Sequence, residues 1–493
     1  MNRHTAAAAA LAALLVAPSA PAYAQTPPPT PTPRDRIARA LTAMGGEQAV
    51  RGLTTVSLEF YGANFALGQE ETPDSPARAN MVAGRTTTDY THSRRTSSVE
   101  LRNVQGAVNR LRRVTDGGIG LLETNGRFAP DGPGAVAGVE TSMRREPERL
   151  LLAALDQGSA LSVLPPKRWR GEPHDGVRYL GRDTLDLYFD RRSGLLTVIE
   201  AVTEDGILGD RRTVTWYTRW QDAGGVSFAR QYDQYVNDRL ATQSITTAVT
   251  VNAALADSVF AIPDSIAQRA QKASPVPPPP VVTLVELAPY VWRAEGGSHH
   301  SLVIEQPDRL VVIEAPQNAR RSQAVLDTLR ARFPGKPVGL VVDTHHHWDH
   351  AGGLRAYLAA GIPVVTHAQN AGFVRGIGAT SKTQMPDALS RKQRQAPAVR
   401  TVDDSLVIGA GDSRVVLYRL PTTHVQGMLA AYVPSAKILF NSDVLTPGAT
   451  LAPAGSKEIA TFIQARGIVV ERVVGGHGGV ASLGDIEKAA QTQ

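Results

Sequence analysis

The sequence predicts an α+β protein with two domains: a mainly antiparallel, β-rich domain followed by a domain in which strands and helices alternate. Two observations predict this division. A chain of 493 residues is longer than one hydrophobic core usually serves, which favours two domains of roughly 100–250 residues each. The hydrophobic periodicity also changes along the chain, and the change falls at a proline-rich stretch, residues 273–280.

The first 24 residues have the layout of an export signal. Arg3 supplies the positive start, residues 6–16 form a short apolar stretch, and Ala22-Tyr23-Ala24 is a small-x-small cleavage site. We therefore expect cleavage after Ala24 and a mature protein in the periplasm or outside the cell. The alternative is an apolar N-terminal helix that stays in the fold.

Residues 34–272, after a proline-rich linker at 25–33, are expected to form the β-rich domain. The pattern opens with a helical spacing of apolar residues, which Gly45-Gly46 should end. Alternating residues then predict strands with glycine-bearing turns, and a helix or two that include residues 146–156. The clearest strands are at 54–61, 185–189, 213–220 and 245–251.

This arrangement, a Gly-Gly helix followed by long curved strands, resembles the lipoprotein-carrier-like domains of the periplasm. The resemblance implies a scaffolding or binding role. His92 and His174 are the histidines of this domain, and neither has an acid, base or nucleophile grouped with it in the sequence. We expect both to be surface residues, with His174 in a loop beside Pro173.

Residues 281–493 follow the second linker and are expected to form the other domain, with helices on the outer faces of its sheets. The predicted helices include residues 322–333 and 353–359. The predicted strands are at 302–304, 310–314, 339–343, 364–366, 414–420, 429–433, 438–441 and 469–474.

Composition excludes several classes of protein. There is no cysteine, so disulfides, cysteine metal ligands and cysteine nucleophiles are ruled out. The formal net charge of +6 comes from scattered arginines, which is typical of a solvated surface and not of a nucleic-acid groove. After the export signal, no apolar run reaches the roughly 18 residues that a membrane span needs. The sequence therefore points to a small-molecule substrate, and it leaves the oligomeric state open.

The chemistry lies in one loop. Directly after the strand at 339–343 come Thr344-His345-His346-His347-Trp348-Asp349-His350. Histidines at i and i+2 of an extended chain can point the same way, so His345 and His347 can hold one metal ion while Asp349 and His350 turn toward a second. The alternative is a solvated polar loop, but imidazoles packed together would repel one another when charged, and a metal makes the arrangement favourable.

The pattern His345-x-His347-x-Asp349-His350 resembles the signature of the metallo-β-lactamase superfamily, whose fold is an αβ/βα sandwich. Three later residues match that family's ligands in the expected order: His424 completes the first zinc site, Asp443 bridges the two metals, and His477 completes the second site. The resemblance covers residues 281–493 and implies two zinc ions, although iron or manganese would suit the same ligands.

The resemblance further implies a hydrolase in which a hydroxide held by the two metals is the nucleophile, with Asp349 and Asp443 as the catalytic carboxylates that orient it. Dedicated β-lactamases usually carry cysteine or serine at the position of Asp443. An ester, lactone or amide is therefore the expected substrate, with a β-lactam still possible. Two alternatives stay open: a non-haem iron oxidoreductase on the same fold, and a periplasmic binding protein with a vestigial metal site.

Several other residues near these motifs need an interpretation. The strand at 310–314 ends in Glu314, where this family usually has an aspartate, so its supporting contact is an open question. His299 and His300 precede a strand, and we favour plain strand-entry residues over residues that line the cleft or contact substrate. His367 follows a strand end and has the same two interpretations. His346 and Trp348 are expected to pack or reach outward.

Overall fold

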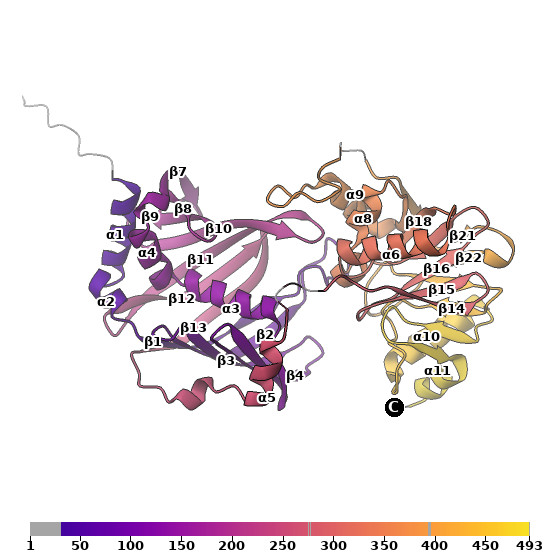
Figure 1. The fold of residues 1–493 in the computed structure, drawn as a ribbon, viewed down its shortest axis with the longest axis horizontal. Helices are drawn as coiled ribbons and strands as arrows, with labels where there is room; N and C mark the ends of the chain where they lie inside the picture. The colour runs from indigo at the N-terminus through magenta and orange to yellow at the C-terminus, as the bar shows by residue number, and fades with distance from the viewer. Residues whose placement is uncertain (1–30, 275, 277, 393–395, 493) are drawn as a thin grey trace, which may run out of the picture.

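The computed structural model describes residues 31–274, 276, 278–392 and 396–492. The predicted export signal lies outside these residues, as do parts of both proline-rich linkers. Within the described ranges, no helix is both long and apolar enough to cross a membrane. The chain forms two lobes, one built on a 13-stranded sheet and the other on a seven-stranded and a six-stranded sheet (Figure 1).

The N-terminal lobe is a single large antiparallel sheet, as predicted. Its strand order is β6-β5-β4-β3-β2-β1-β13-β12-β11-β10-β9-β8-β7, so nearly all neighbours in the sheet are also neighbours in the chain. The strands are β1 (Thr55–Phe65), β2 (Ala79–Asp89), β3 (Arg94–Arg102), β4 (Val108–Asp116), β5 (Ile119–Thr124), β6 (Arg127–Pro130), β7 (Leu161–Trp169), β8 (Glu172–Leu180), β9 (Thr184–Asp190), β10 (Leu196–Asp205), β11 (Gly209–Ala223), β12 (Val226–Val236) and β13 (Arg239–Val251).

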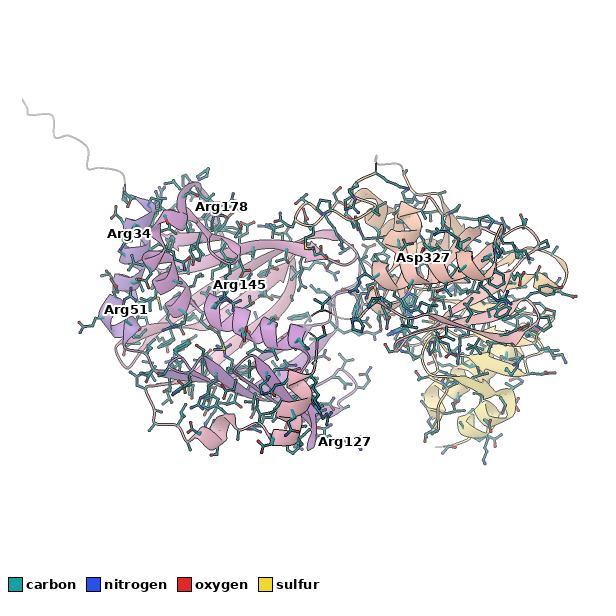
Figure 2. All side chains as sticks on the ribbon, viewed as in Figure 1. Arg34, Arg51, Arg127, Arg145, Arg178 and Asp327 are labelled. Carbon is teal, nitrogen blue, oxygen red and sulfur yellow. The ribbon has the colours of Figure 1, made fainter. Side chains whose placement is uncertain are left out.

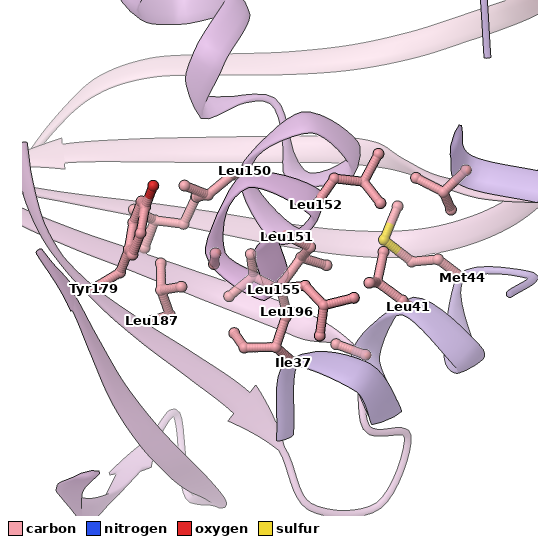
Figure 3. Close-up of a cluster of buried hydrophobic side chains, with 14 of the residues drawn as sticks. Ile37, Leu41, Met44, Leu150, Leu151, Leu152, Leu155, Tyr179, Leu187 and Leu196 are labelled. Carbon is pink, nitrogen blue, oxygen red and sulfur yellow. The ribbon is translucent and has the colours of Figure 1, made fainter. Parts of the chain in front are cut away.

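Helices cover one part of this sheet. They are α1 (Pro33–Ala43), α2 (Glu47–Arg51), α3 (Pro133–Arg145), α4 (Pro147–Asp156) and α5 (Asp264–Gln271), with short 3-10 turns η1 (Gly158–Ala160) and η2 (Asp257–Phe260). Helix α1 begins where Thr32 and Asp35 form a capping box, and the chain leaves it through Gly45 and Gly46, which both have positive φ. Buried side chains of α1 and α4, among them Ile37 and Leu151, pack together against the sheet (Figure 3).

Two expectations for this lobe need comment. Helix α3 was not predicted, because Gly134 and Gly138 weaken its helical pattern. The prediction for His174 was wrong: it lies within β8 and is only 2% exposed. Its ring contacts Thr197 Oγ1 at 2.8 Å and the carbonyl of Glu172 at 2.9 Å, because β8 continues through Pro173 between two paired strands. His92 is exposed, as expected.

The C-terminal lobe contains two smaller sheets. The first has the order β14-β15-β16-β17-β18-β19-β20 and the second runs from β21 to β26 in chain order. The strands are β14 (Thr283–Ala288), β15 (Val291–Glu295), β16 (Ser301–Glu305), β17 (Leu310–Ile313), β18 (Val338–Asp343), β19 (Val364–His367), β20 (Val399–Val402), β21 (Ser405–Ile408), β22 (Val415–Arg419), β23 (Leu429–Val433), β24 (Ile438–Phe440), β25 (Arg472–Val474) and β26 (Val480–Ser482).

The helices of this lobe lie between the strands, as the sequence predicts. They are α6 (Ala319–Arg332), α7 (Trp348–Ala351), α8 (Leu354–Ala359), α9 (Ala371–Ala379), α10 (Pro453–Arg466) and α11 (Leu483–Ala490), with 3-10 turns η3 (Ala368–Asn370) and η4 (Gly411–Ser413). The strand predicted at 469–474 is shorter than expected, because only its last three residues pair with β24 and β26.

The core of this lobe consists of separate buried clusters, and alternate residues of one strand belong to different clusters. Val311 and Ile313 of β17 face a buried cluster that also contains side chains of the second sheet, including Phe440. Val312 faces the opposite way, into a cluster with residues of α6 and α8. Leu439 of β24 joins α10 and α11 in a third cluster. This period of two is the expected signature of strands buried on both faces.

The turn between β10 and β11 belongs to the N-terminal lobe and packs against the C-terminal lobe. Figure 1 shows this end of the hairpin reaching toward α8 and α9. Ile207 at the turn is 7% exposed and belongs to the buried cluster of the C-terminal lobe. Arg355 Nη1 donates to the carbonyl of Ile207 at 3.3 Å, and Asp210 accepts hydrogen bonds from Thr383. Arg51, labelled in Figure 2, lies at the end of the N-terminal lobe that is far from this contact.

Candidate metal centre

Strand ends of the C-terminal lobe bring the predicted site together. Residues 344–347 follow β18, and residues 348–350 lie in α7. His424 lies between β22 and β23, Asp443 lies after β24, and His477 lies between β25 and β26. An isolated bridge pairs His299 with His477, which fixes the segment before β16 against the last of these loops.

The side chains form two groups of four. The first group is His345, His347, His424 and Asp443, and the second group is His299, Asp349, His350 and His477. Within each group, one nitrogen or carboxylate oxygen per residue lies within 4.8 Å of the others. All seven residues singled out in the sequence fall into these two groups.

Asp443 lies between the groups. Its Oδ2 atom is 3.0 Å from His424 Nε2 of the first group and 3.5 Å from His350 Nε2 of the second, while its Oδ1 atom is 3.2 Å from His477 Nε2. Burial acts to raise the pKa of this carboxyl, but the contacts with His350, His424 and His477 hold it well below the ordinary range. One carboxylate therefore contacts histidines of both groups.

The buried histidines have free nitrogens that a metal would use. His345 Nε2 and His350 Nε2 are buried and have no hydrogen-bond partner. Burial, followed by the charges of neighbouring histidines, lowers the pKa of His345 well below its ordinary value, and burial lowers that of His347 to about 3. Both are neutral at pH 7. His345 therefore has the form that binds metals, a neutral imidazole with an unpaired ring nitrogen. The nitrogen and carboxylate donors of the two groups fit zinc, iron or manganese.

Glu314 supplies the supporting contact that the sequence left open. This side chain is fully buried, and its Oε2 atom is 3.0 Å from His350 Nδ1. Its other oxygen accepts a hydrogen bond from Thr344 Oγ1 at 2.7 Å and another from Ser442. A carboxylate on the second ring nitrogen of a metal-binding histidine fixes the orientation of the ring. The glutamate therefore orients His350 through the nitrogen that faces away from Asp443.

The favoured prediction for His299 was wrong. It is 8% exposed, its Nε2 atom is 3.4 Å from Asp349 Oδ2, and its ring centroid is 3.8 Å from that of His477. The one sequence signal for this placement is the pair of adjacent histidines before a strand. His300 and His367 belong to neither group, and His367 instead accepts from the backbone N–H of Gln369.

A cavity of about 610 Å³ lies beside the motif loop, between the two lobes. His346 is buried and packs edge-on against Phe373, while Trp348 is half exposed. The cavity is lined by these three residues and, from the N-terminal lobe, by Leu67, Ile207 and Leu208. His346 thus packs and Trp348 reaches outward, as expected, and both lie at the junction of the lobes.

Comparisons with known proteins agree with this geometry. Residues 294–477 match the model of the metallo-beta-lactamase superfamily. The chain is 25% identical over 175 residues to 2,4-dinitroanisole O-demethylase subunit alpha of Nocardioides sp. (strain JS1661). This match covers 35% of this chain and 48% of that protein. It is 27% identical over 159 residues to acyl-coenzyme A thioesterase MBLAC2 of Bos taurus, covering 28% and 55%. The chain thus spans about half the length of the curated relatives it matches.

Solved structures similar to this chain include a metallo-beta-lactamase from Pontibacter korlensis, at 19% identity and a TM-score of 0.35, covering 43% of this chain and 100% of that one. Another is the metallo-beta-lactamase FIM-1 from Pseudomonas aeruginosa in its mono-zinc form, at 18% identity and a TM-score of 0.34, covering 43% and 94%. The part of the chain that matches the metallo-β-lactamase superfamily is thus residues 294–477, within the C-terminal domain.

Proposed function

We propose that the C-terminal domain, arranged as an αβ/βα sandwich, is an exported hydrolase that holds two zinc ions and cleaves an ester, lactone or amide. The observation that carries this proposal is the position of Asp443, whose two oxygens contact histidines of both four-residue groups. A site that held one ion would have no need for a second complete set of donors.

Bound in this site, two divalent ions would supply Lewis acidity toward a substrate carbonyl and would lower the pKa of a water molecule. The side chains of the protein would hold the ions and orient the water molecule. The first group would hold one ion and the second group the other, with Asp443 shared between them. Asp349 and Asp443 are 20% and 17% exposed, so both carboxylates can orient a water molecule that enters from solvent and pass its proton onward.

One curated relative supports hydrolysis without fixing the substrate: it is named as a thioesterase, an enzyme that hydrolyses a carboxylic acid derivative. The aspartate at position 443, where dedicated β-lactamases usually carry cysteine or serine, favours an ester, lactone or amide. A β-lactam is a cyclic amide and belongs in the same screen.

Metal analysis combined with a substrate panel tests the proposal. Protein purified with zinc should contain two zinc ions per chain and hydrolyse at least one of a chromogenic cephalosporin, a chromogenic ester, a thioester and a lactone. Asp349→Ala should abolish turnover and lower the content of the second metal. Asp327→Ala, at an exposed position of α6, is the matched control and should behave as the wild type.

Three results would reject the proposal. Full activity in Asp349→Ala would remove this carboxylate from the mechanism, and no turnover by fully metallated protein on any substrate would remove the hydrolase. A firmly bound iron pair with redox activity would replace it with the oxidoreductase alternative.

A further inference from the structure

The loop between β1 and β2 places residues of the N-terminal lobe in contact with the metal centre. Gln69 Nε2 donates to Asp349 Oδ1 at 2.7 Å. His347 Nε2 lies 2.9 Å from the carbonyl oxygen of Glu70, and Arg78 Nη2 donates to the carbonyl of His424 at 2.7 Å. A single loop, residues 66–78, thus contacts one residue of the second four-residue group and two of the first.

This loop is held on the side of its own lobe. Glu70 is 1% exposed and forms an ion pair with Arg239 of β13 at 2.5 Å. The same Glu70 carboxylate accepts the backbone N–H of Gly68 at 2.9 Å. The ion pair between buried Glu70 and exposed Arg239 therefore ties the turn of the loop to the large sheet.

The loop is also held on the side of the C-terminal lobe. The backbone N–H of Gln426 donates to the carbonyl of Glu71 at 2.8 Å, and its side-chain amide donates to the Glu71 carboxylate at 2.6 Å. The backbone N–H of Trp348 donates to the carbonyl of Gly68 at 3.2 Å. Because both sides are anchored, the loop presents Gln69 and the Glu70 carbonyl in fixed positions.

The loop contacts His347 and Asp349 through side-chain atoms that do not face the other members of their four-residue groups. His347 uses Nε2 toward the Glu70 carbonyl, which leaves Nδ1 to face His424 Nε2 at 3.1 Å. Asp349 receives Gln69 on Oδ1, which leaves Oδ2 to face His299 and His350. Outer hydrogen bonds of this kind fix the tautomer and orientation of metal ligands, and their loss typically costs 10–100-fold in metal affinity.

We propose that Gln69 is a positioning residue of the metal centre, and that the N-terminal lobe, through residues 66–78, is the outer support of the metal ligands His347 and Asp349. This inference rests on the metal binding in the proposed function and is independent of the bond that is cleaved. It gives the N-terminal lobe a definite role, because metal affinity in the C-terminal lobe then depends on a side chain that lies 280 residues away from Asp349 in sequence.

Gln69→Met in the full chain is the direct test, because methionine keeps the length of glutamine and removes the amide donor. The zinc dissociation constants of the two sites would be measured by chelator competition, and the ligand-field absorption spectrum would be recorded with cobalt in place of zinc. We expect zinc to bind about 10–100-fold more weakly at the site that has the lower affinity. We also expect the cobalt spectrum to shift. Gln69→Glu, which replaces the donating amide with a carboxylate, should also lose the hydrogen bond to Asp349 and shift the cobalt spectrum.

Gln105→Met is the matched control. Gln105 is exposed in the loop between β3 and β4, and this variant should keep the wild-type dissociation constants and spectrum. If Gln69→Met fails to fold, Gln69→Glu, which has nearly the same shape as glutamine, carries the test.

The outcomes separate the two proposals. Wild-type affinity and an unchanged cobalt spectrum in Gln69→Met would overturn the role of Gln69 and leave the proposed hydrolase standing. Weakened metal binding in Gln69→Met, together with a wild type that binds two metals and hydrolyses nothing, would support Gln69 and reject the hydrolase. A wild type that binds no metal would overturn both.

Discussion

At the scale of single residues, Glu314 shows how a small departure from a family pattern is accommodated. The extra methylene of glutamate does not remove the carboxylate from the site. Its two oxygens reach His350 on one side and Thr344 and Ser442 on the other. Although burial acts to lower it, contact with Glu314 and Asp443 raises the pKa of His350 well above its ordinary value. The carboxylate thus makes this imidazole more basic and therefore a stronger ligand.

Glu314→Gln should weaken binding of the second metal by about 10–100-fold, because the amide cannot supply the negative charge that His350 now faces. Chelator competition measures this change. Glu305→Gln is the control: its carboxylate pairs with Lys336 at the edge of β16, and its loss should leave metal affinity unaltered. Equal dissociation constants for Glu314→Gln and the wild type would contradict the role assigned to Glu314.

The sequence could predict that the seven candidate residues lie close together, because they follow strands and their order along the chain matches one family. His299 and Gln69 could not be found in this way. His299 reaches the site through a single bridge to His477, and Gln69 reaches it from another lobe. Both placements depend on tertiary packing, which leaves no periodic or spacing signal in the local sequence.

At the scale of elements, the strands of the C-terminal lobe were easier to predict than the helix α3. Continuous apolar runs such as Val338–Asp343 mark strands buried on both faces, whereas α3 contains two glycines and lies partly exposed on the sheet. The hairpin of β10 and β11 was predicted only in part. Only residues 213–220, within β11, were predicted as a strand, and nothing in the pattern indicates that the turn inserts Ile207 into the other lobe.

Ile207→Ala should lower the free energy of unfolding by about 2–4 kcal/mol, because it removes buried methyl groups and leaves a cavity among residues of the C-terminal lobe. Leu208 is the matched control: it is the next residue, is 40% exposed, and Leu208→Ala should cost less than about 1 kcal/mol. Denaturant unfolding followed by fluorescence measures both. If the two variants lost the same stability, the turn would not be anchored through Ile207.

At the scale of the whole molecule, the N-terminal lobe holds a buried acid far from the metal centre. Glu148 is 4% exposed and accepts a hydrogen bond from Tyr90 at 2.6 Å. Burial, and then the charge of Glu146, raises the pKa of Glu148 to about 7. The folded state therefore holds this proton more tightly than the unfolded state does. The resulting stabilisation is complete below the unfolded pKa of about 4.5 and is lost as the pH rises through about 7.

Glu148→Gln should remove this pH dependence, because glutamine stays neutral and its oxygen still accepts from Tyr90. Between about pH 4 and pH 8 the wild type should lose about 3 kcal/mol of unfolding free energy relative to the variant. Urea unfolding at several pH values measures the difference. Glu172→Gln, at an exposed position, should track the wild type at every pH, and a Glu148→Gln curve parallel to both would show that this acid has an ordinary pKa.

The contacts of residues 66–78 also set when the metal centre can form as the chain folds. Gln69 and Asp349 are 280 residues apart in sequence, and Arg78 and His424 are 346 apart. Closing loops of this length is slow and entropically costly, so such contacts form late, after the local hairpins of the large sheet. We therefore expect the supported site to be among the last features to assemble, so that metal would bind to a nearly folded chain.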